Sequence, residues 1–81
     1  MQTSDRWEGD LGRQIRALRL RQNLDQQQLA DRAGIALNAV KNLEGGKGTT
    51  LRSLVQTLRA LNRIEWLQSL APSVSISPIQ M

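Results

Sequence analysis

Helix-breaking residues divide this sequence into short segments, and their spacing constrains the fold more than any other feature. The breaks fall at Asn23, Gly34, the run 45–48, Asn62 and Pro72. Asn23 and Gly34 can also close helices in the left-handed conformation. The intervals are rich in Leu, Ala, Arg and Gln, which favour helix, and none alternates like a strand before the C-terminal tail. We therefore expect an all-α bundle of five short helices.

Capping signals set the predicted helix boundaries. Asp10 is a suitable N-cap for the first helix, and Thr49 or Thr50 for the fourth. Asp25 caps the second helix, where Gln28 completes a capping box. The predicted helices span about residues 10–22, 26–33, 37–44, 50–61 and 63–71.

Apolar residues repeat with helical spacing, so one face of each helix can contribute to a core. The inward positions are Leu11, Ile15, Leu18, Leu29, Ala30, Ala33, Val40, Leu43, Leu51, Leu54, Val55, Leu58 and Leu61. A chain of 81 residues supports one small domain, placed at residues 10–71. Residues 1–9 are polar and are expected to form a flexible arm. Residues 72–81, rich in Ser and containing two prolines, leave the domain as a tail.

The composition disfavours catalytic and metal chemistry. With no His and no Cys, the chain offers no imidazole or thiolate nucleophile, no disulfide and no ordinary zinc site. A two-carboxylate site would need a cleft that so short a chain rarely builds. The first ten residues lack the apolar core of a signal peptide, and no apolar run approaches the roughly 20 residues of a membrane span. At a formal charge of +4, we expect a cytoplasmic, cofactor-free binding module without enzyme activity.

The second and third predicted helices are the most informative about function. They are short, they are joined by a tight turn containing Gly34, and a glycine run follows them. This describes a helix-turn-helix, whose second helix enters the major groove of DNA. The outward positions of that helix are Leu37, Asn38, Lys41 and Asn42. Asn can bond adenine, Lys can donate to guanine and Leu can pack on a thymine methyl group. An ordinary solvated helix face is the alternative explanation.

A specific combination of residues recurs at fixed spacing in this region: Gln, Leu-Ala, Gly, a buried aliphatic residue and Leu-Glu. The stretches are 26–35 (QQQLADRAGI), 37–40 (LNAV) and 43–46 (LEGG), together with Leu11, Gly12, Ile15, Arg16, Leu18, Arg19, Leu54, Leu58 and Leu61. This combination resembles the Cro/C1 (XRE) class of prokaryotic and phage repressors, from about Leu11 through Leu67. The resemblance implies a five-helix, lambda-repressor-like DNA-binding domain.

The resemblance also implies roles for particular side chains. Gln26, which opens the second helix, would contact a DNA phosphate and brace the recognition helix. Lys47 and Arg52 match positions that approach the DNA backbone. Gln27 and Gln28 can reach a phosphate, take a capping role or remain solvated, and Leu37 departs from the polar residue common at its position. The expected DNA contacts are therefore Gln26, Gln27, Leu37, Asn38, Lys41, Asn42, Lys47 and Arg52.

Arg19 and Glu44 fall where many members of this class hold an ion pair between the first and third helices. Both sit beside apolar positions, which favours the pair over two unrelated surface charges, the commoner fate of charged residues. Such a pair would fix the recognition helix against the first helix, although desolvation opposes the attraction.

The fifth predicted helix is the candidate surface for self-association. Ile64, Leu67 and Leu70 form its apolar stripe, and Trp66 lies off that stripe, where it can pack in the core or mark a subunit interface. Combined with the resemblance, this predicts a transcriptional regulator, specifically a repressor. It would bind double-stranded DNA at a palindromic operator as a homodimer.

A second function fits the same sequence. Small members of this class often serve as antitoxins of type II toxin–antitoxin pairs, as HipB-like partners of HipA-like kinases do, repressing their own operon and neutralising the toxin. Val74, Ile76 and Ile79 would then anchor a toxin protein, with a disordered terminus as the alternative. A membrane-surface domain is disfavoured, because the apolar helix faces are needed for the core.

Overall fold

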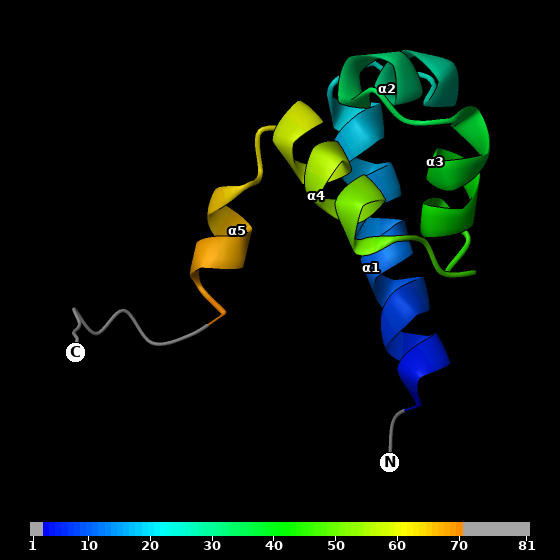
Figure 1. Ribbon diagram of the computed structural model, residues 1–81, viewed down its shortest axis with the longest axis vertical. Coiled ribbons are helices and arrows are strands. Elements are labelled where there is room, and N and C mark those ends of the chain that lie inside the picture. Colours follow the sequence, from blue (N-terminus) through cyan, green and yellow to red (C-terminus); the bar gives the residue numbers. More distant parts are fainter. Residues whose placement is uncertain (1–2, 71–81) are drawn as a thin grey trace.

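The computed structural model describes residues 3–70, and within this range all regular structure is helical (Figure 1). The helices are α1 (Ser4–Arg21), α2 (Gln26–Ala33), α3 (Leu37–Glu44), α4 (Leu51–Ala60) and α5 (Glu65–Gln68). The prediction of an all-α, five-helix domain is confirmed. The tail residues Val74, Ile76 and Ile79, proposed as anchors for a toxin protein, lie outside the described residues.

Helix α1 begins earlier than the sequence pattern predicted. Its N-cap is Thr3, whose side chain accepts a hydrogen bond from the backbone nitrogen of Arg6 at 3.3 Å. The predicted N-cap, Asp10, lies inside the helix and pairs with Arg13 on the next turn. The assignment of Asp10 as N-cap was therefore wrong, and residues 4–9 of the expected flexible arm form the first turns of α1. An acid at this position stabilises a helix through an i,i+3 pair as well as through a cap.

The other helix boundaries agree closely with the capping signals. Asn23 and Gly34 adopt left-handed φ values of 59° and 71°, as predicted for helix ends. Thr50, one of the two candidate caps, accepts a hydrogen bond from the Ser53 nitrogen at the start of α4. The fifth helix is the exception, because it comprises only four residues. Its N-cap, Ile64, offers no capping side chain, so the helix predicted from about residue 63 is reduced to one turn.

Helices α1 to α4 enclose the core. Helix α2 packs against both α3 and α4, and α1 packs along α3. The fully or nearly buried core residues are Ile15, Leu24, Leu29, Ala30, Ala33, Val40, Leu43, Leu58 and Leu61. One predicted inward position is wrong: Leu51 is 75% exposed, because it is the first residue of α4, where the chain leaves the loop that follows α3.

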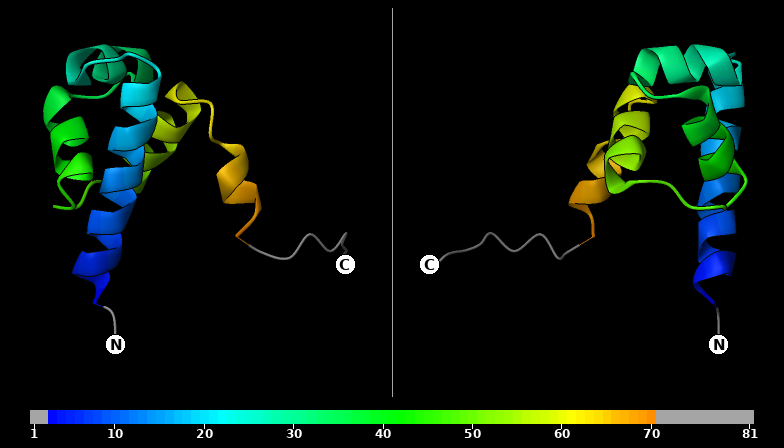
Figure 2. Two further views of the ribbon diagram at one scale, coloured as in Figure 1. Left: turned by 180° about the vertical axis from the view of Figure 1, so that it is seen from behind. Right: turned by 45° about the vertical axis from the view of Figure 1, so that its right-hand side comes forward.

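Helix α5 projects from the bundle on the side of α4 that lies away from α3 (Figure 2). This arrangement leaves the α2–α3 face and the α5 side of the molecule well separated (Figure 1). In the described range, no helix has the length and apolar character needed to cross a bilayer.

Candidate nucleic-acid interface

Helices α2 and α3 and the turn between them form a locally well-determined unit. At the start of α2, Asp25 Oδ1 accepts from the Gln28 nitrogen at 2.7 Å, and Gln28 Oε1 accepts from the Asp25 nitrogen at 2.8 Å. The capping box predicted from these two residues is therefore confirmed. At its end, Gly34 turns the chain in the left-handed conformation, and the Ile35 nitrogen donates to the carbonyl of Ala30 at 3.0 Å. Two short helices are thus held in a fixed relative orientation.

The outward face of α3 presents three polar side chains. Asn38, Lys41 and Asn42 are exposed and share one helix face through their i, i+3 and i+4 spacing. Leu37, the fourth predicted base contact, is half-buried at the first position of α3. The single acidic residue of α3, Glu44, is turned away from this face, so the exposed surface suits an approaching polyanion.

Arg19, Glu44 and Gln26 connect α1, α3 and α2 in one hydrogen-bonded network. Arg19 Nε lies 2.6 Å from Glu44 Oε2, and Arg19 Nη2 lies 3.0 Å from Glu44 Oε1, so the pair is bidentate. Arg19 Nη1 donates to the carbonyl of Leu24 at 2.9 Å, and Gln26 Nε2 donates to Glu44 Oε1 at 3.2 Å. The structure therefore brings the two residues of the predicted ion pair together and adds a third helix to their contact.

The ion pair is shielded from solvent. The side chains of Arg19 and Glu44 are only 7% and 4% exposed. The hydrogen bonds to Glu44 raise the pKa of Arg19 above its ordinary value, against the opposing effect of burial. Arg19 consequently stays charged wherever the fold persists, and its charge requires the Glu44 carboxylate as a partner.

Glycines allow α1 to approach the C-terminal end of α3 at backbone distance. A Cβ atom on Gly12 would lie 2.3 Å from the carbonyl oxygen of Leu43 and 2.6 Å from that of Glu44. One turn earlier, the backbone of Gly9 lies so close to Gly46 that a Cβ on Gly46 would meet it at 2.8 Å. The position of α3 on the domain therefore depends on this contact as well as on the ion pair.

The predicted phosphate contacts surround the α2–α3 unit. Lys47 is exposed in the loop between α3 and α4, and Arg52 is exposed in the first turn of α4. Gln27 is exposed at the start of α2, where its Nε2 donates to Asp31 at 2.9 Å. Gln26 is half-buried, and although one hydrogen of its amide is used by Glu44, the amide nitrogen carries a second.

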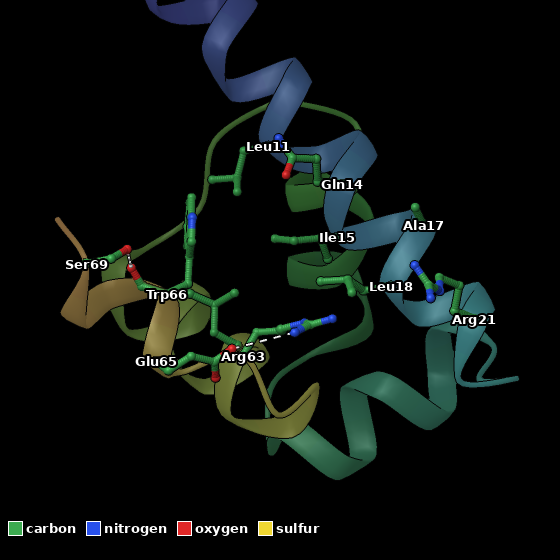
Figure 3. A pocket seen from close by; sticks show the side chains of 11 residues that line it. Leu11, Gln14, Ile15, Ala17, Leu18, Arg21, Arg63, Glu65, Trp66 and Ser69 are labelled. Carbon is green, nitrogen blue, oxygen red and sulfur yellow. Dashed lines mark hydrogen bonds and ion pairs between the residues drawn. The ribbon is translucent and has the colours of Figure 1, made fainter.

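The predicted dimer residues lie elsewhere. Ile64, the N-cap of α5, is 38% exposed, and Leu70, which follows the C-cap of α5, is 75% exposed; Leu67, within α5, is half-buried. Trp66, 43% exposed, is directed toward α1 across an apolar groove (Figure 3). The candidate site residues therefore form two separate surfaces, one on α2 and α3 and one on α5.

Sequence reasoning missed two features of this site. The close approach at Gly12 had one available signal, a glycine inside a strongly helical segment, where it is unfavourable unless packing requires it. The second feature is the partner of Gln26: the resemblance implied that Gln26 braces the recognition helix, but it did not indicate Glu44, 18 positions away, as the residue that Gln26 contacts.

Comparison with known proteins gives a clear result for most of the chain. Residues 10–64 match a family model described as a helix-turn-helix domain. This range runs from the middle of α1 to the turn before α5 and includes the whole α2–α3 unit. No curated protein matches the chain.

Proposed function

The chain belongs to the helix-turn-helix family of DNA-binding transcription regulators, and from this premise we propose that it is a repressor that binds a palindromic operator as a homodimer. The carrying observation is the exposed, acid-free face of α3, held on the domain by a buried ion pair. In this proposal, binding alone performs the function, because a dimer on an operator near a promoter would exclude polymerase.

The proposed base contacts are on α3. Asn38 and Asn42 can each form bidentate hydrogen bonds with adenine, and Lys41 can donate to guanine. Leu37, at the start of the helix, would pack on a thymine methyl group rather than donate a hydrogen bond. The Arg19–Glu44–Gln26 network supports this proposal, because a recognition helix discriminates bases only when its side chains arrive in a fixed register.

The proposed phosphate contacts are Gln26, Gln27, Lys47 and Arg52. The two cations would neutralise phosphates and release counterions, which makes affinity dependent on salt. The two glutamines would add neutral hydrogen bonds that position α3 in the groove without reading sequence. Selection of bound DNA from a random pool tests the proposal directly, since a specific regulator should enrich a two-fold symmetric site. Recovery of no enriched sequence would contradict it.

Alanine substitution should separate base contacts from phosphate contacts. Asn38→Ala and Asn42→Ala should each lose about 1–3 kcal/mol of discrimination at one base pair per half-site, with little change in binding to random DNA. Lys47→Ala and Arg52→Ala should weaken binding to every sequence and reduce the salt dependence. The measurement is a titration of operator and scrambled DNA at several salt concentrations. Unchanged operator preference in both Asn variants would contradict the proposed face.

Two copies of the domain are proposed to pair through α5, so that their α3 helices enter half-sites about 34 Å apart. Ile64 and Leu70 would form the centre of this isologous contact, with Leu67 and Trp66 beside them. The exposed apolar side chains at both ends of α5 support this placement.

Leu70→Asp should weaken self-association by about 2 kcal/mol or more, the scale of an interface hot spot. Leu51→Asp is the matched control, because Leu51 is also 75% exposed but lies on α4. Sedimentation over a concentration series, without DNA, measures the self-association of the two variants and of the wild-type protein. A wild-type protein that stays monomeric at high concentration, or equal losses in the two variants, would contradict pairing through α5.

A further inference from the structure

An apolar groove of about 530 Å³ lies between α1 and α5 (Figure 3). Leu11 and Leu18 from α1 and Trp66 from α5 form its apolar walls. A second hollow continues the groove along α1 toward Trp7 and shares Leu11 and Trp66 with the first. Both tryptophans of the chain thus border one continuous depression on the side away from the α2–α3 unit.

The walls of this groove are mainly apolar, and in the isolated domain they face water. Trp7 is 59% exposed and Trp66 is 43% exposed, so both indole rings at this groove remain open to a partner. Two of the three arginines at its rim, Arg13 and Arg63, are paired with Asp10 and Glu65 respectively. The third, Arg21, has no ion pair among the described residues and lies on the last turn of α1. Because the walls between these charges are apolar, a largely apolar, uncharged occupant suits the groove better than a strongly charged one.

The chain itself supplies such an occupant. Ser69 lines the groove, so the backbone leaves the described part of the structure at the groove's edge. The eleven residues 71–81 contain no Lys, Arg, Asp or Glu. Val74 and Ile76 are two positions apart, so they would face the same side of an extended segment. Pro72 and Pro78 lack a backbone N–H, which lowers the number of donors that docking would bury.

The lengths also match. The α1 wall from Trp7 to Arg21 covers 14 residue steps, or about 21 Å at the helical rise. Residues 71–79 in extended form reach about 26 Å. The segment can therefore start beside Ser69 and place Val74 and Ile76 over the groove without a change in the helices.

We propose that residues 74–79 dock as an extended segment into the α1–α5 groove of their own chain. Val74 and Ile76 lie against Leu11, Ala17 and the groove side of Trp66. The segment covers the apolar walls and fixes α5 on α1. This inference does not depend on DNA binding, since the groove is on the other side of the domain.

Cross-linking tests which segment occupies the groove. The chain has no Cys, so paired substitutions create a single possible disulfide per chain. Val74→Cys keeps a small apolar side chain and is combined with Ala17→Cys on α1. Mild oxidation of the dilute protein should give an intramolecular disulfide, since docking brings the Cα atoms within the roughly 7 Å that a disulfide requires. Val74→Cys combined with Arg32→Cys, on α2, is the control and should cross-link far less.

Fluorescence of full-length variants provides an independent measurement. In a Trp7→Phe background, Trp66 is the only tryptophan of the chain, so it dominates the fluorescence. Ile76→Asp should shift its emission to longer wavelength and remove its protection from acrylamide, whereas Ser75→Asp, on the opposite side of an extended segment, should leave both unchanged. Equal behaviour of the two variants, or cross-linking no greater than the control, overturns the proposal. Disulfides formed only between chains also overturn it and assign the groove to a second copy.

Discussion

Replacing Gly12 by alanine should lower the free energy of unfolding by about 2 kcal/mol or more. The added Cβ would lie 2.3 Å and 2.6 Å from two backbone carbonyl oxygens at the end of α3, and no rotamer change can relieve a clash with backbone. Overpacking of this kind costs about 1–3 kcal/mol or more. Alanine stabilises a helix interior over glycine by only about 0.5–1 kcal/mol, so the clash determines the sign of the effect. Urea denaturation at equilibrium measures the difference.

Gly9→Ala is the matched control for this prediction. Gly9 is one turn earlier in the same helix, and the nearest atom to its added Cβ would be Arg13 Nη1 at 3.4 Å, the end of a flexible side chain. This variant should therefore be neutral or more stable by up to about 1 kcal/mol. If both variants gained stability equally, the close contact between α1 and α3 would be disproved.

Gly12→Ala should also affect DNA binding more than its stability loss alone accounts for. The clash involves Leu43 and Glu44, in the last turn of α3, so the fraction that remains folded must hold α3 in a shifted position. Base discrimination depends on small displacements, because a side chain at about 3 Å from a base edge loses its hydrogen bond when it moves by one more ångström.

Local signals explain what the sequence predicted well. The limits of α2 and α3 are marked by Asp25 with Gln28, by Gly34 and by the glycine run after Glu44, and each acts on residues only a few positions away. The start of α1 was predicted wrongly, because the sequence offers two residues that can cap it. Asp10 and Thr3 are both good N-caps, and the sequence does not show that Asp10 can pair with Arg13 while the helix continues to Thr3.

Features that depend on contacts between residues far apart in the sequence were predicted less well. Leu51 fits the apolar stripe of α4, yet it is 75% exposed, because it is the first residue of the helix, where the chain leaves the loop that follows α3. The pairing of Arg19 with Glu44 was predicted from the resemblance to a known class; their apolar neighbours favoured a buried position for each, but did not identify the partner 25 positions away. The glycine contact at Gly12 depends on the same long-range geometry.

The buried ion pair offers the largest expected effect. Glu44→Gln or Arg19→Gln should each destabilise the domain by about 3–5 kcal/mol, because the remaining charge would be buried without a partner. The Arg19 variant also leaves the Leu24 carbonyl without its donor, and the Glu44 variant weakens the bond to Gln26. For a domain of this size, whose total stability is itself about 5–15 kcal/mol or less, either change can unfold a large fraction of the protein.

A double-mutant cycle isolates the pair from these other contacts. The combination Arg19→Gln with Glu44→Gln should be far less destabilising than the sum of the single variants, giving a coupling of about 2 kcal/mol or more. The exposed Arg13–Asp10 pair on α1 provides the internal control: its cycle should give at most about 0.5 kcal/mol, typical of neighbouring charges on a helix surface. Equal coupling in the two cycles would show that burial adds nothing to the Arg19–Glu44 interaction. It would then leave the backbone contact at Gly12 as the main determinant of where α3 sits.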